Sequence, residues 1–113
     1  MIIYKIFRAP EWGAFVARGE TEGAPVDLAD GFIHFSTGRQ VAETAARHFA
    51  DEDGLVLVAV NAEDLGDALR WEPSRGGDLF PHLYRPLRIH EVLFKARLPL
   101  GPDGRHVFPE GVL

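Results

Sequence analysis

Residues 55–61, LVLVAVN, form a continuous apolar run that constrains the fold more than any other segment of the chain. An acidic turn, DEDG, comes directly before it. A run of this length, β-branched in part and bounded by turn residues, is typical of a strand that is buried on both faces. We therefore predict a strand at 55–61 with other elements packed against both of its sides.

Apolar patterns elsewhere predict further strands and two helices. Alternating apolar side chains favour strands, and Pro10 suits the first turn of a helix because its missing N–H would be unpaired there. Asn61 is the expected cap of a short helical turn. The predicted strands are 2–7, 31–36, 69–74 (an edge strand) and 89–98, the predicted helices are 11–19 and 38–50, and the helical turn covers 61–69.

Two segments rich in turn-forming residues, 20–30 and 75–86, are predicted to be irregular loops. Because only two substantial helices lie among the strands, the pattern favours an α+β fold over a doubly wound α/β sheet. A chain of 113 residues is long enough for one domain with its own core and too short for two. We expect a single compact domain over 1–113 whose sheet is mixed or antiparallel.

Composition and charge exclude several classes of function. The chain has no cysteine, so disulfides, thiolate metal ligands and cysteine nucleophiles are all excluded. Its formal net charge of -5 argues against a nucleic-acid partner. No window approaches the roughly 18 apolar residues of a membrane span, and the first residues do not resemble a signal peptide. We expect a cytoplasmic protein that does not enter a membrane.

The segment 30–40, DGFIHFSTGRQ, combines a short strand with a polar strand-to-helix junction. His34 and Ser36 are two residues apart on the strand, so their side chains point to the same face. Thr37 and Gln40 have the spacing of a capping box, in which two side chains satisfy backbone N–H groups at a helix start. The result is a donor-rich junction of the kind that binds an anion or a sugar.

A second segment, FPHLYRPL at 80–87, is similarly dense in polar and aromatic side chains. Loops that a scaffold holds in place commonly carry function. We predict that His34, Ser36, His82 and Tyr84 line one cleft. Its composition suits a planar, hydroxylated or phosphorylated small molecule.

Other assignments for these residues remain open. His34 could be a buried structural histidine, and His82 could hydrogen-bond only to its own loop. The histidine spacing matches no metal-binding motif, so we assign no metal site. The sequence also lacks a GxSxG nucleophile turn, a GxGxxG loop and a phosphate-binding P-loop, which argues against those hydrolase and nucleotide folds.

Together, DGFIHFSTGRQ and LFPHLYRPL resemble the small bacterial proteins of domain-of-unknown-function family 952. The resemblance runs from the first strand, IIYKI, to RLPL at 97–100. In that family the second motif usually reads HLYG, and here Arg85 takes the place of the glycine. The family is similar in fold to the ADP-ribosyltransferases, which implies an α+β domain with a split antiparallel sheet that grips NAD in a cleft.

The resemblance implies roles for individual residues. In several of those transferases a His-Gly-Ser or His-Gly-Thr strand holds the adenosine ribose and the nicotinamide amide of NAD. His34-Phe35-Ser36 resembles that motif, with phenylalanine in place of glycine. A second position of the transferases stacks on the nicotinamide ring, and Tyr84 or His82 could match it.

The catalytic glutamate of those transferases has no counterpart by motif, and Glu72 and Glu91 are only positional candidates. No metal ligand is implied. The catalytic candidates are His34 and His82, and the NAD-binding candidates are His34, Ser36, Thr37, Tyr84 and Arg85.

Two functions from different classes remain open. In the first, the cleft binds NAD or a related nucleotide, and the protein transfers or cleaves at the ribose–nicotinamide bond. In the second, the protein is a non-catalytic module that binds a nucleotide or another small molecule. The expected partner in both is a small-molecule ligand, and neither the acceptor nor the oligomeric state follows from the sequence.

Overall fold

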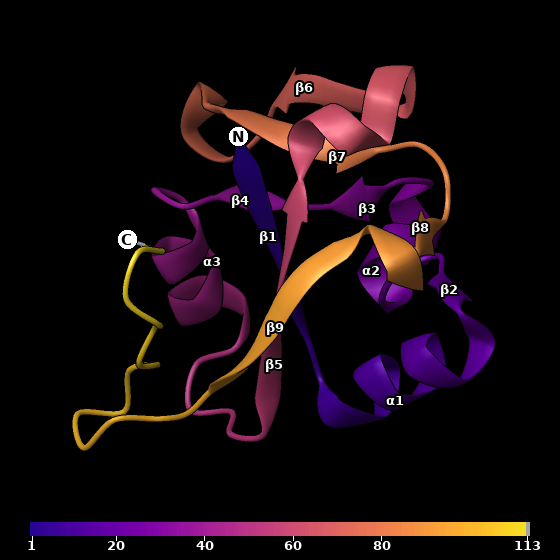
Figure 1. Cartoon of the computed structure of the whole chain (residues 1–113). Coiled ribbons are helices and arrows are strands. Elements are labelled where there is room, and N and C mark those ends of the chain that lie inside the picture. The colour runs from indigo at the N-terminus through magenta and orange to yellow at the C-terminus, as the bar shows by residue number, and fades with distance from the viewer. Residues whose placement is uncertain (113) are drawn as a thin grey trace.

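Strand β5 (Leu55–Asn61) lies inside a four-stranded antiparallel sheet (Figure 1). Its neighbours are β1 (Ile2–Phe7) and β9 (Val92–Leu98), and β1 pairs on its other side with β4 (Ser36–Thr37). The computed structural model describes residues 1–112, and within it the side chains of residues 57–60 are fully buried. The prediction of a strand covered on both faces is confirmed.

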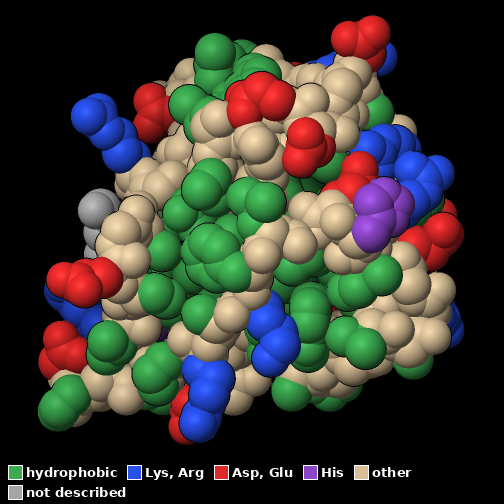
Figure 2. All heavy atoms as spheres, viewed as in Figure 1, with side chains coloured by type: hydrophobic (Ala, Val, Ile, Leu, Met, Phe, Trp, Pro, Cys, Tyr) green, Lys and Arg blue, Asp and Glu red, His purple; other side chains and the backbone are tan. Residues whose placement is uncertain are grey.

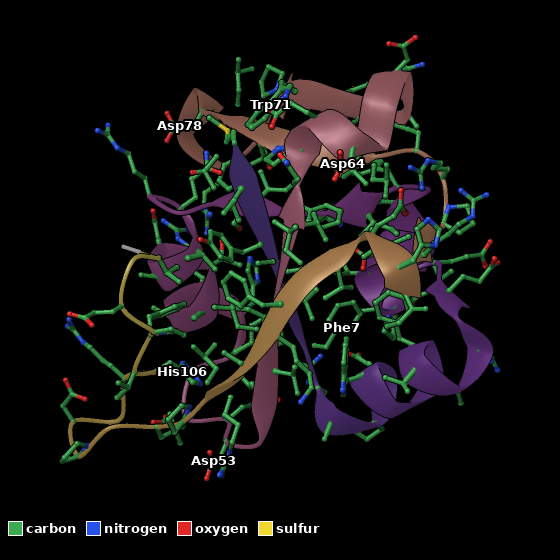
Figure 3. The ribbon with its side chains drawn as sticks, in the orientation of Figure 1. Phe7, Asp53, Asp64, Trp71, Asp78 and His106 are labelled. Atoms are coloured by element: carbon green, nitrogen blue, oxygen red, sulfur yellow. The ribbon has the colours of Figure 1, made fainter. Side chains whose placement is uncertain are left out.

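The two faces of this sheet are covered by different elements. Helix α1 (Ala9–Arg18) packs Phe15 against Phe7, with ring centroids 5.6 Å apart, and Figure 3 shows Phe7 above this helix. Helix α3 (Val41–His48) covers the other face and buries Val41. Because side chains alternate along a strand, β1 and β5 supply residues to a separate hydrophobic cluster on each face.

The helix boundaries follow from local signals. Helix α1 has Pro10 in its first turn and ends at Gly19, whose φ of 79° is left-handed, as predicted. Helix α3 begins at Val41, later than predicted. Half of the predicted capping box is present, because the Thr37 backbone N–H donates to Gln40 Oε1 at 3.0 Å. The other half is replaced by a backbone bond from the Gln40 N–H to the Thr37 carbonyl, also at 3.0 Å.

The prediction of an irregular loop at 20–30 is wrong. Helix α2 (Pro25–Asp30) occupies its second half. Pro25 has no N–H that would need a partner in the first turn, and the Asp27 carboxylate accepts the Ala24 backbone N–H at 2.7 Å. The start of the segment forms a short two-stranded sheet from β2 (Glu20–Thr21) and β8 (Leu87–Arg88).

The prediction of a loop at 75–86 is also wrong. After a 3₁₀ turn, η2 (Arg75–Gly77), the chain forms β7 (Leu79–Leu83), the middle strand of a three-stranded antiparallel sheet. Its neighbours are β3 (Ile33–His34) and β6 (Leu69–Pro73). Apolar burial outweighs the proline and glycine content here, since four of the five residues of β7 are buried. Strand β6 lies at the sheet edge, as predicted.

The strand predicted at 31–36 is divided between two sheets. Its first half pairs with β7 as β3, and its second half pairs with β1 as β4. The division falls at Phe35, whose backbone N–H donates to the Pro81 carbonyl at 3.0 Å. Proline has no N–H with which to return that bond, so the pairing with β7 ends there and the chain crosses to β1. His34 and Ser36 therefore sit where the two sheets meet.

Two further elements differ in detail from the prediction. The turn at 61–69 is the 3₁₀ helix η1 (Ala62–Ala68), but the side chain of Asn61 does not cap it, and Asn61 Oδ1 is buried without a hydrogen-bond partner in the described chain. The predicted strand 89–98 begins with a 3₁₀ turn, η3 (Ile89–Glu91), and β9 follows.

Strand β9 lies at an edge of the four-stranded sheet, and two of its large apolar side chains are exposed. Leu93 and Phe94 are 50% and 41% exposed. Figure 2 shows apolar side chains gathered on the face of the molecule that carries β9. All strand pairs within residues 1–112 are antiparallel, and helices pack against the sheets, so the prediction of an α+β fold is confirmed. Among residues 1–112, no helix has the length and apolar character needed to cross a membrane.

Candidate functional site

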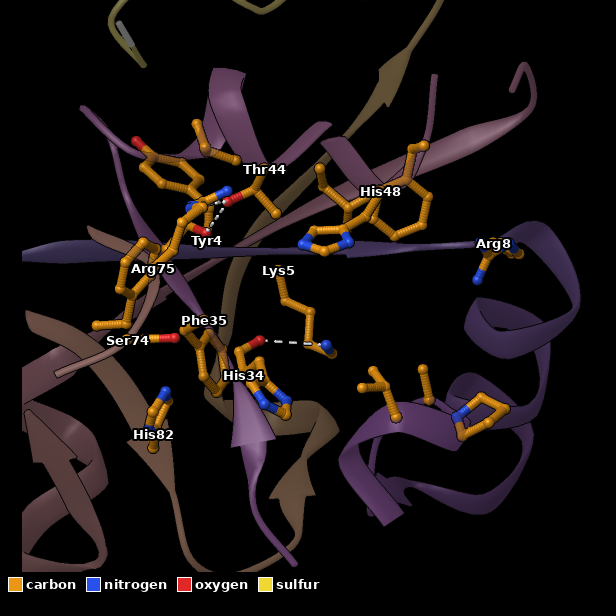
Figure 4. A pocket seen from close by; sticks show the side chains of 18 residues that line it. Tyr4, Lys5, Arg8, His34, Phe35, Thr44, His48, Ser74, Arg75 and His82 are labelled. Carbon is orange, nitrogen blue, oxygen red and sulfur yellow. Dashed lines mark hydrogen bonds between the residues drawn. The ribbon is translucent and has the colours of Figure 1, made fainter. Parts of the chain in front are cut away.

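A cavity of about 560 Å³ opens where the two larger sheets meet (Figure 4). It exists because β4 pairs with only Ile3 and Tyr4 and leaves the following edge of β1 without a strand partner on that side. The edge residues Tyr4 to Ile6, together with α3, form one part of the wall. Strands β3 and β7, the turn η2 and the start of α2 supply the rest. The division of the predicted strand thus creates the site.

A buried acid holds His34 in place. His34 Nδ1 donates to Asp27 Oδ1 at 2.6 Å, and the His34 backbone N–H donates to the same oxygen at 3.0 Å. The other oxygen of Asp27 pairs with Lys5 Nζ at 2.9 Å. Burial favours the neutral form of Asp27, but the hydrogen bonds from His34 and the charge of Lys5 outweigh it and lower its pKa to about 2.

Lys5 also ties the strand of His34 to the central sheet. It is almost fully buried, and its Nζ donates to the His34 carbonyl at 3.1 Å (Figure 4). On the solvent side, His34 Nε2 lies 3.0 Å from Oδ2 of Asp30. Each ring nitrogen of His34 therefore faces a carboxylate oxygen.

A second carboxylate orients His82. His82 Nδ1 lies 2.8 Å from Glu72 Oε1, and the Tyr84 hydroxyl donates to the same oxygen at 2.6 Å. The hydrogen bond from Tyr84 lowers the pKa of Glu72 most, and the hydrogen bond from His82 lowers it further. The hydrogen bond to Glu72 in turn raises the pKa of Tyr84.

The two histidines are directly opposite each other in the sheet. His34 on β3 pairs with His82 on β7, and their ring centroids are 5.3 Å apart in an edge-to-face arrangement. Phe32 packs against both rings, at 4.6 Å from His34 and 4.2 Å from His82, and lies 5.1 Å from Tyr84. Two carboxylate-oriented imidazoles therefore share one aromatic cluster, the kind of arrangement that can move protons.

A chain of hydroxyls leads from Ser36 to a guanidinium. Thr44 Oγ1 donates to the Gln40 carbonyl at 3.1 Å, so it accepts from Ser36 Oγ at 2.8 Å and from Arg75 Nη2 at 3.0 Å. Arg75 also stacks on the Phe80 ring, 4.7 Å from its centroid.

The charged groups on the cavity wall are all basic. Lys5, Arg8 and Arg75 line it together with three histidines, and none of the described residues that line it is an aspartate or a glutamate. Burial and the nearby cations, Arg75 first among them, lower the pKa of His48. The cavity wall is therefore basic, although the whole chain has a formal net charge of -5.

Only some of the predicted site residues reach this cavity. His34, Ser36 and His82 line it. Tyr84 is not part of its wall, and its side chain is 39% exposed. Thr37 acts through its backbone at the start of α3. Arg85 pairs instead with Glu91, Nη2 to Oε2 at 2.7 Å.

The structure also separates the two candidate glutamates. Glu72 is hydrogen-bonded to His82 and Tyr84, beside the aromatic cluster. Glu91 accepts the Arg88 backbone N–H and pairs with Arg85 at the start of η3. Only Glu72 is in contact with a candidate catalytic residue.

Sequence reasoning missed several residues of the site, among them Lys5, Asp27, Thr44 and Arg75. A lysine in the middle of an apolar strand, IIYKIF, was the one available signal, because a charge at a buried position requires a partner. The others come from segments that were predicted to be loops or an ordinary helix. Within residues 1–112, no cluster of three or more metal-ligating side chains could hold a metal ion.

Comparison with known proteins gives close structural relatives. The crystal structure of protein CC0527 from Caulobacter crescentus is 53% identical and has a TM-score of 0.94, over 99% of this chain and 98% of that one. A crystal structure of a double mutant of that protein is 51% identical, with the same TM-score and coverage. Its solution NMR structure is 57% identical, with a TM-score of 0.84 over 92% of this chain and 90% of that one.

No curated protein matches this chain. The family model described as "Protein of unknown function (DUF952)" matches residues 6–94, which include both sequence motifs and all of the cavity wall except Tyr4 and Lys5. The chain therefore belongs to the DUF952 family.

Proposed function

We propose that the cavity binds NAD or a related nucleotide. The observation that carries the proposal is the wall itself, which has three basic side chains, three histidines and no described carboxylate. Such a ligand has negative phosphates, sugar hydroxyls and planar rings. Basic side chains match the phosphates, Ser36 and His34 can hydrogen-bond to hydroxyls, and the aromatic residues of the wall can pack against the rings.

The size of the cavity supports the same proposal. Small-molecule and cofactor sites commonly enclose roughly 300–1,000 Å³ and combine an apolar lining with a few placed polar groups. This cavity, at about 560 Å³, falls within that range. Phe35, Phe49 and Phe80 supply much of its apolar lining. We further propose that the fold is related to that of the ADP-ribosyltransferases, whose split sheet grips NAD.

Transfer or cleavage at the ribose–nicotinamide bond is the proposed reaction. NAD would supply the bond that breaks, and its electron pair would leave with nicotinamide. His34 and Ser36 would orient the ribose and the amide. Glu72 does not line the cavity and would act only through its hydrogen bond to His82. His82, bonded to Glu72, would accept the proton of the attacking hydroxyl or water.

One observation favours a non-catalytic binding module as the second candidate. Phe35 stands where the related transferases have a glycine, and it is buried in the core. A phenylalanine at this position limits how closely the backbone can approach a nicotinamide ring. In this alternative the same cavity holds the nucleotide and no bond breaks.

The test is to incubate the purified protein with NAD and to measure both binding, by calorimetry, and released nicotinamide, by chromatography. We expect binding, and its loss in the variant His34→Ala. The matched control is His90→Ala, because His90 is an exposed histidine that does not line the cavity. Binding without nicotinamide release would select the binding module. Failure of NAD, ADP-ribose and ADP all to bind would refute the proposal.

A further inference from the structure

Arg75 differs from the other basic residues of the cavity in having no negative partner. Lys5 pairs with Asp27 at 2.9 Å, and Arg8 pairs with Glu52 at 2.8 Å. Among the described residues, Arg75 forms no ion pair with any carboxylate. The one strong positive charge that the protein leaves uncompensated on this wall is therefore its guanidinium.

The Arg75 side chain is nevertheless held in one orientation. Its Nη2 donates to Thr44 Oγ1 at 3.0 Å, and its guanidinium stacks on the Phe80 ring. Figure 4 shows Arg75 reaching across to Thr44. A long side chain loses conformational entropy when it is fixed in this way. The side chain is preorganised.

Part of the guanidinium is also unsatisfied. Nη1 of Arg75 is buried and has no hydrogen-bond partner among the described residues. An unpaired buried donor is costly, and more so when it belongs to a charged group. An acceptor with several negative oxygens would satisfy it, and a phosphate matches the fork of an arginine better than a single carbonyl does.

Other potential donors line the same cavity. Ser74 precedes Arg75 in the chain, and both line the cavity. His48 lies one turn after Thr44 on α3, so it is on the face of the helix to which Arg75 is bonded. His48 also lines the cavity, and its surroundings are cationic, as an anion site requires.

We propose that Arg75, with Ser74 and His48, forms a subsite for a phosphate group of the ligand. This inference rests on the proposed function and narrows it, because it makes the phosphate, rather than the base or the sugar, the main source of affinity on this wall. The ligand class is then a phosphorylated small molecule such as a nucleoside diphosphate, and the unphosphorylated nucleoside should bind weakly.

Calorimetric titration with inorganic pyrophosphate, ADP and adenosine tests this subsite. Wild-type protein should bind pyrophosphate and ADP, and Arg75→Gln should weaken both by about 10- to 100-fold, the value of hydrogen bonds to a charged group. Arg75→Lys keeps the positive charge but loses the forked donor geometry of the guanidinium. Its affinity for both ligands should therefore lie between those of wild type and Arg75→Gln. The matched control is Arg39→Gln, which removes one charge from an exposed arginine outside the cavity and should change affinity less than about twofold.

The outcomes separate this inference from the proposed function. Equal pyrophosphate and ADP affinity in wild type and Arg75→Gln would refute the subsite while leaving nucleotide binding intact. Binding of adenosine or NAD without any binding of pyrophosphate would do the same. Failure of every compound to bind would refute both proposals. A melting curve of each variant shows whether it is folded. If Arg75→Gln does not fold, Arg75→Lys takes its place in the comparison of ligand affinity with wild type.

Discussion

The two histidine–carboxylate pairs of the site are built in opposite ways. In the first, the acid is buried and the base is accessible: the side chain of Asp27 is 0% exposed and that of His34 is 31% exposed. In the second, the base is buried and the acid is accessible: the side chain of His82 is 6% exposed and that of Glu72 is 34% exposed. Both are centred on one register position of the β3–β7 pair.

This difference indicates that the Asp27 pair stabilises the fold, whereas the Glu72 pair is available to the cavity. Asp27 is surrounded by protein donors and binds the edge of β1 to α2 and β3, so its charge is part of the core. Glu72 bonds to two side chains of the aromatic cluster and remains open to solvent. We therefore expect changes at Asp27 to act on folding and changes at Glu72 to act on whatever the cavity binds.

The largest expected effect is that of Asp27→Asn. The substitution preserves size but leaves the buried ammonium of Lys5 without a negative partner, and breaking such a pair costs about 3–5 kcal/mol of unfolding free energy. Urea unfolding measures the loss. The double variant Asp27→Asn with Lys5→Met should be more stable than Asp27→Asn alone, and the opposite order would show that the charge is not the cause. Glu72→Ala should shift the unfolding curve far less.

The second prediction concerns acid. The pKa of Asp27 is lowered from 3.8 to about 2 in the folded state, so its ionised form stabilises the fold above the unfolded pKa. That contribution, about 2 kcal/mol at neutral pH, is lost as the pH falls from about 4 to about 2. Urea unfolding at several pH values measures it. In Asp27→Asn the free energy of unfolding should lack this part of its pH dependence. If its pH dependence in acid matches that of wild type, other carboxylates are the cause of the loss.

The third prediction is that His34→Ala changes stability only moderately. Asp27 keeps its bonds from Lys5, from the Ala24 N–H and from the His34 backbone N–H, so the loss should be about 1 kcal/mol, the value of one hydrogen bond. Because the hydrogen bond from His34 is the strongest factor that lowers the pKa of Asp27, this variant should also lose stability in acid at a higher pH than wild type does. A loss far above this value would identify His34 as mainly structural.

The sequence predicted those parts of the fold in which local patterns and burial agree. The apolar run of β5, the proline and glycine at the two ends of α1, and the edge strand β6 are of this kind. Segments 20–30 and 75–86 were mistaken for loops because glycine and proline interrupt their apolar residues. Only pairing with distant strands makes β7 regular.

The site was predictable where its residues share a strand face and hidden where they come from different elements. His34, Ser36 and His82 were found because two polar motifs stood out against apolar strands. Asp27 and Arg75 act through contacts with residues 7 and 31 positions away, and no local pattern encodes such distances. Tyr84 and Arg85 directly follow β7, and the turn there directs them away from the cavity.

The smallest predicted effect is spectroscopic and tests the second pair alone. The hydrogen bond that Tyr84 donates to the Glu72 carboxylate raises the pKa of Tyr84 above its ordinary value. Glu72→Ala removes this acceptor and its negative charge, so the pKa of Tyr84 should fall toward the ordinary value, while the melting curve changes little. Ultraviolet titration of the phenolate measures the shift, and Tyr84→Phe identifies the signal because it leaves only the buried Tyr4. An unchanged phenol titration in Glu72→Ala would mean that Tyr84 and Glu72 are not bonded in solution, and Glu72 would then be free to act without the aromatic cluster.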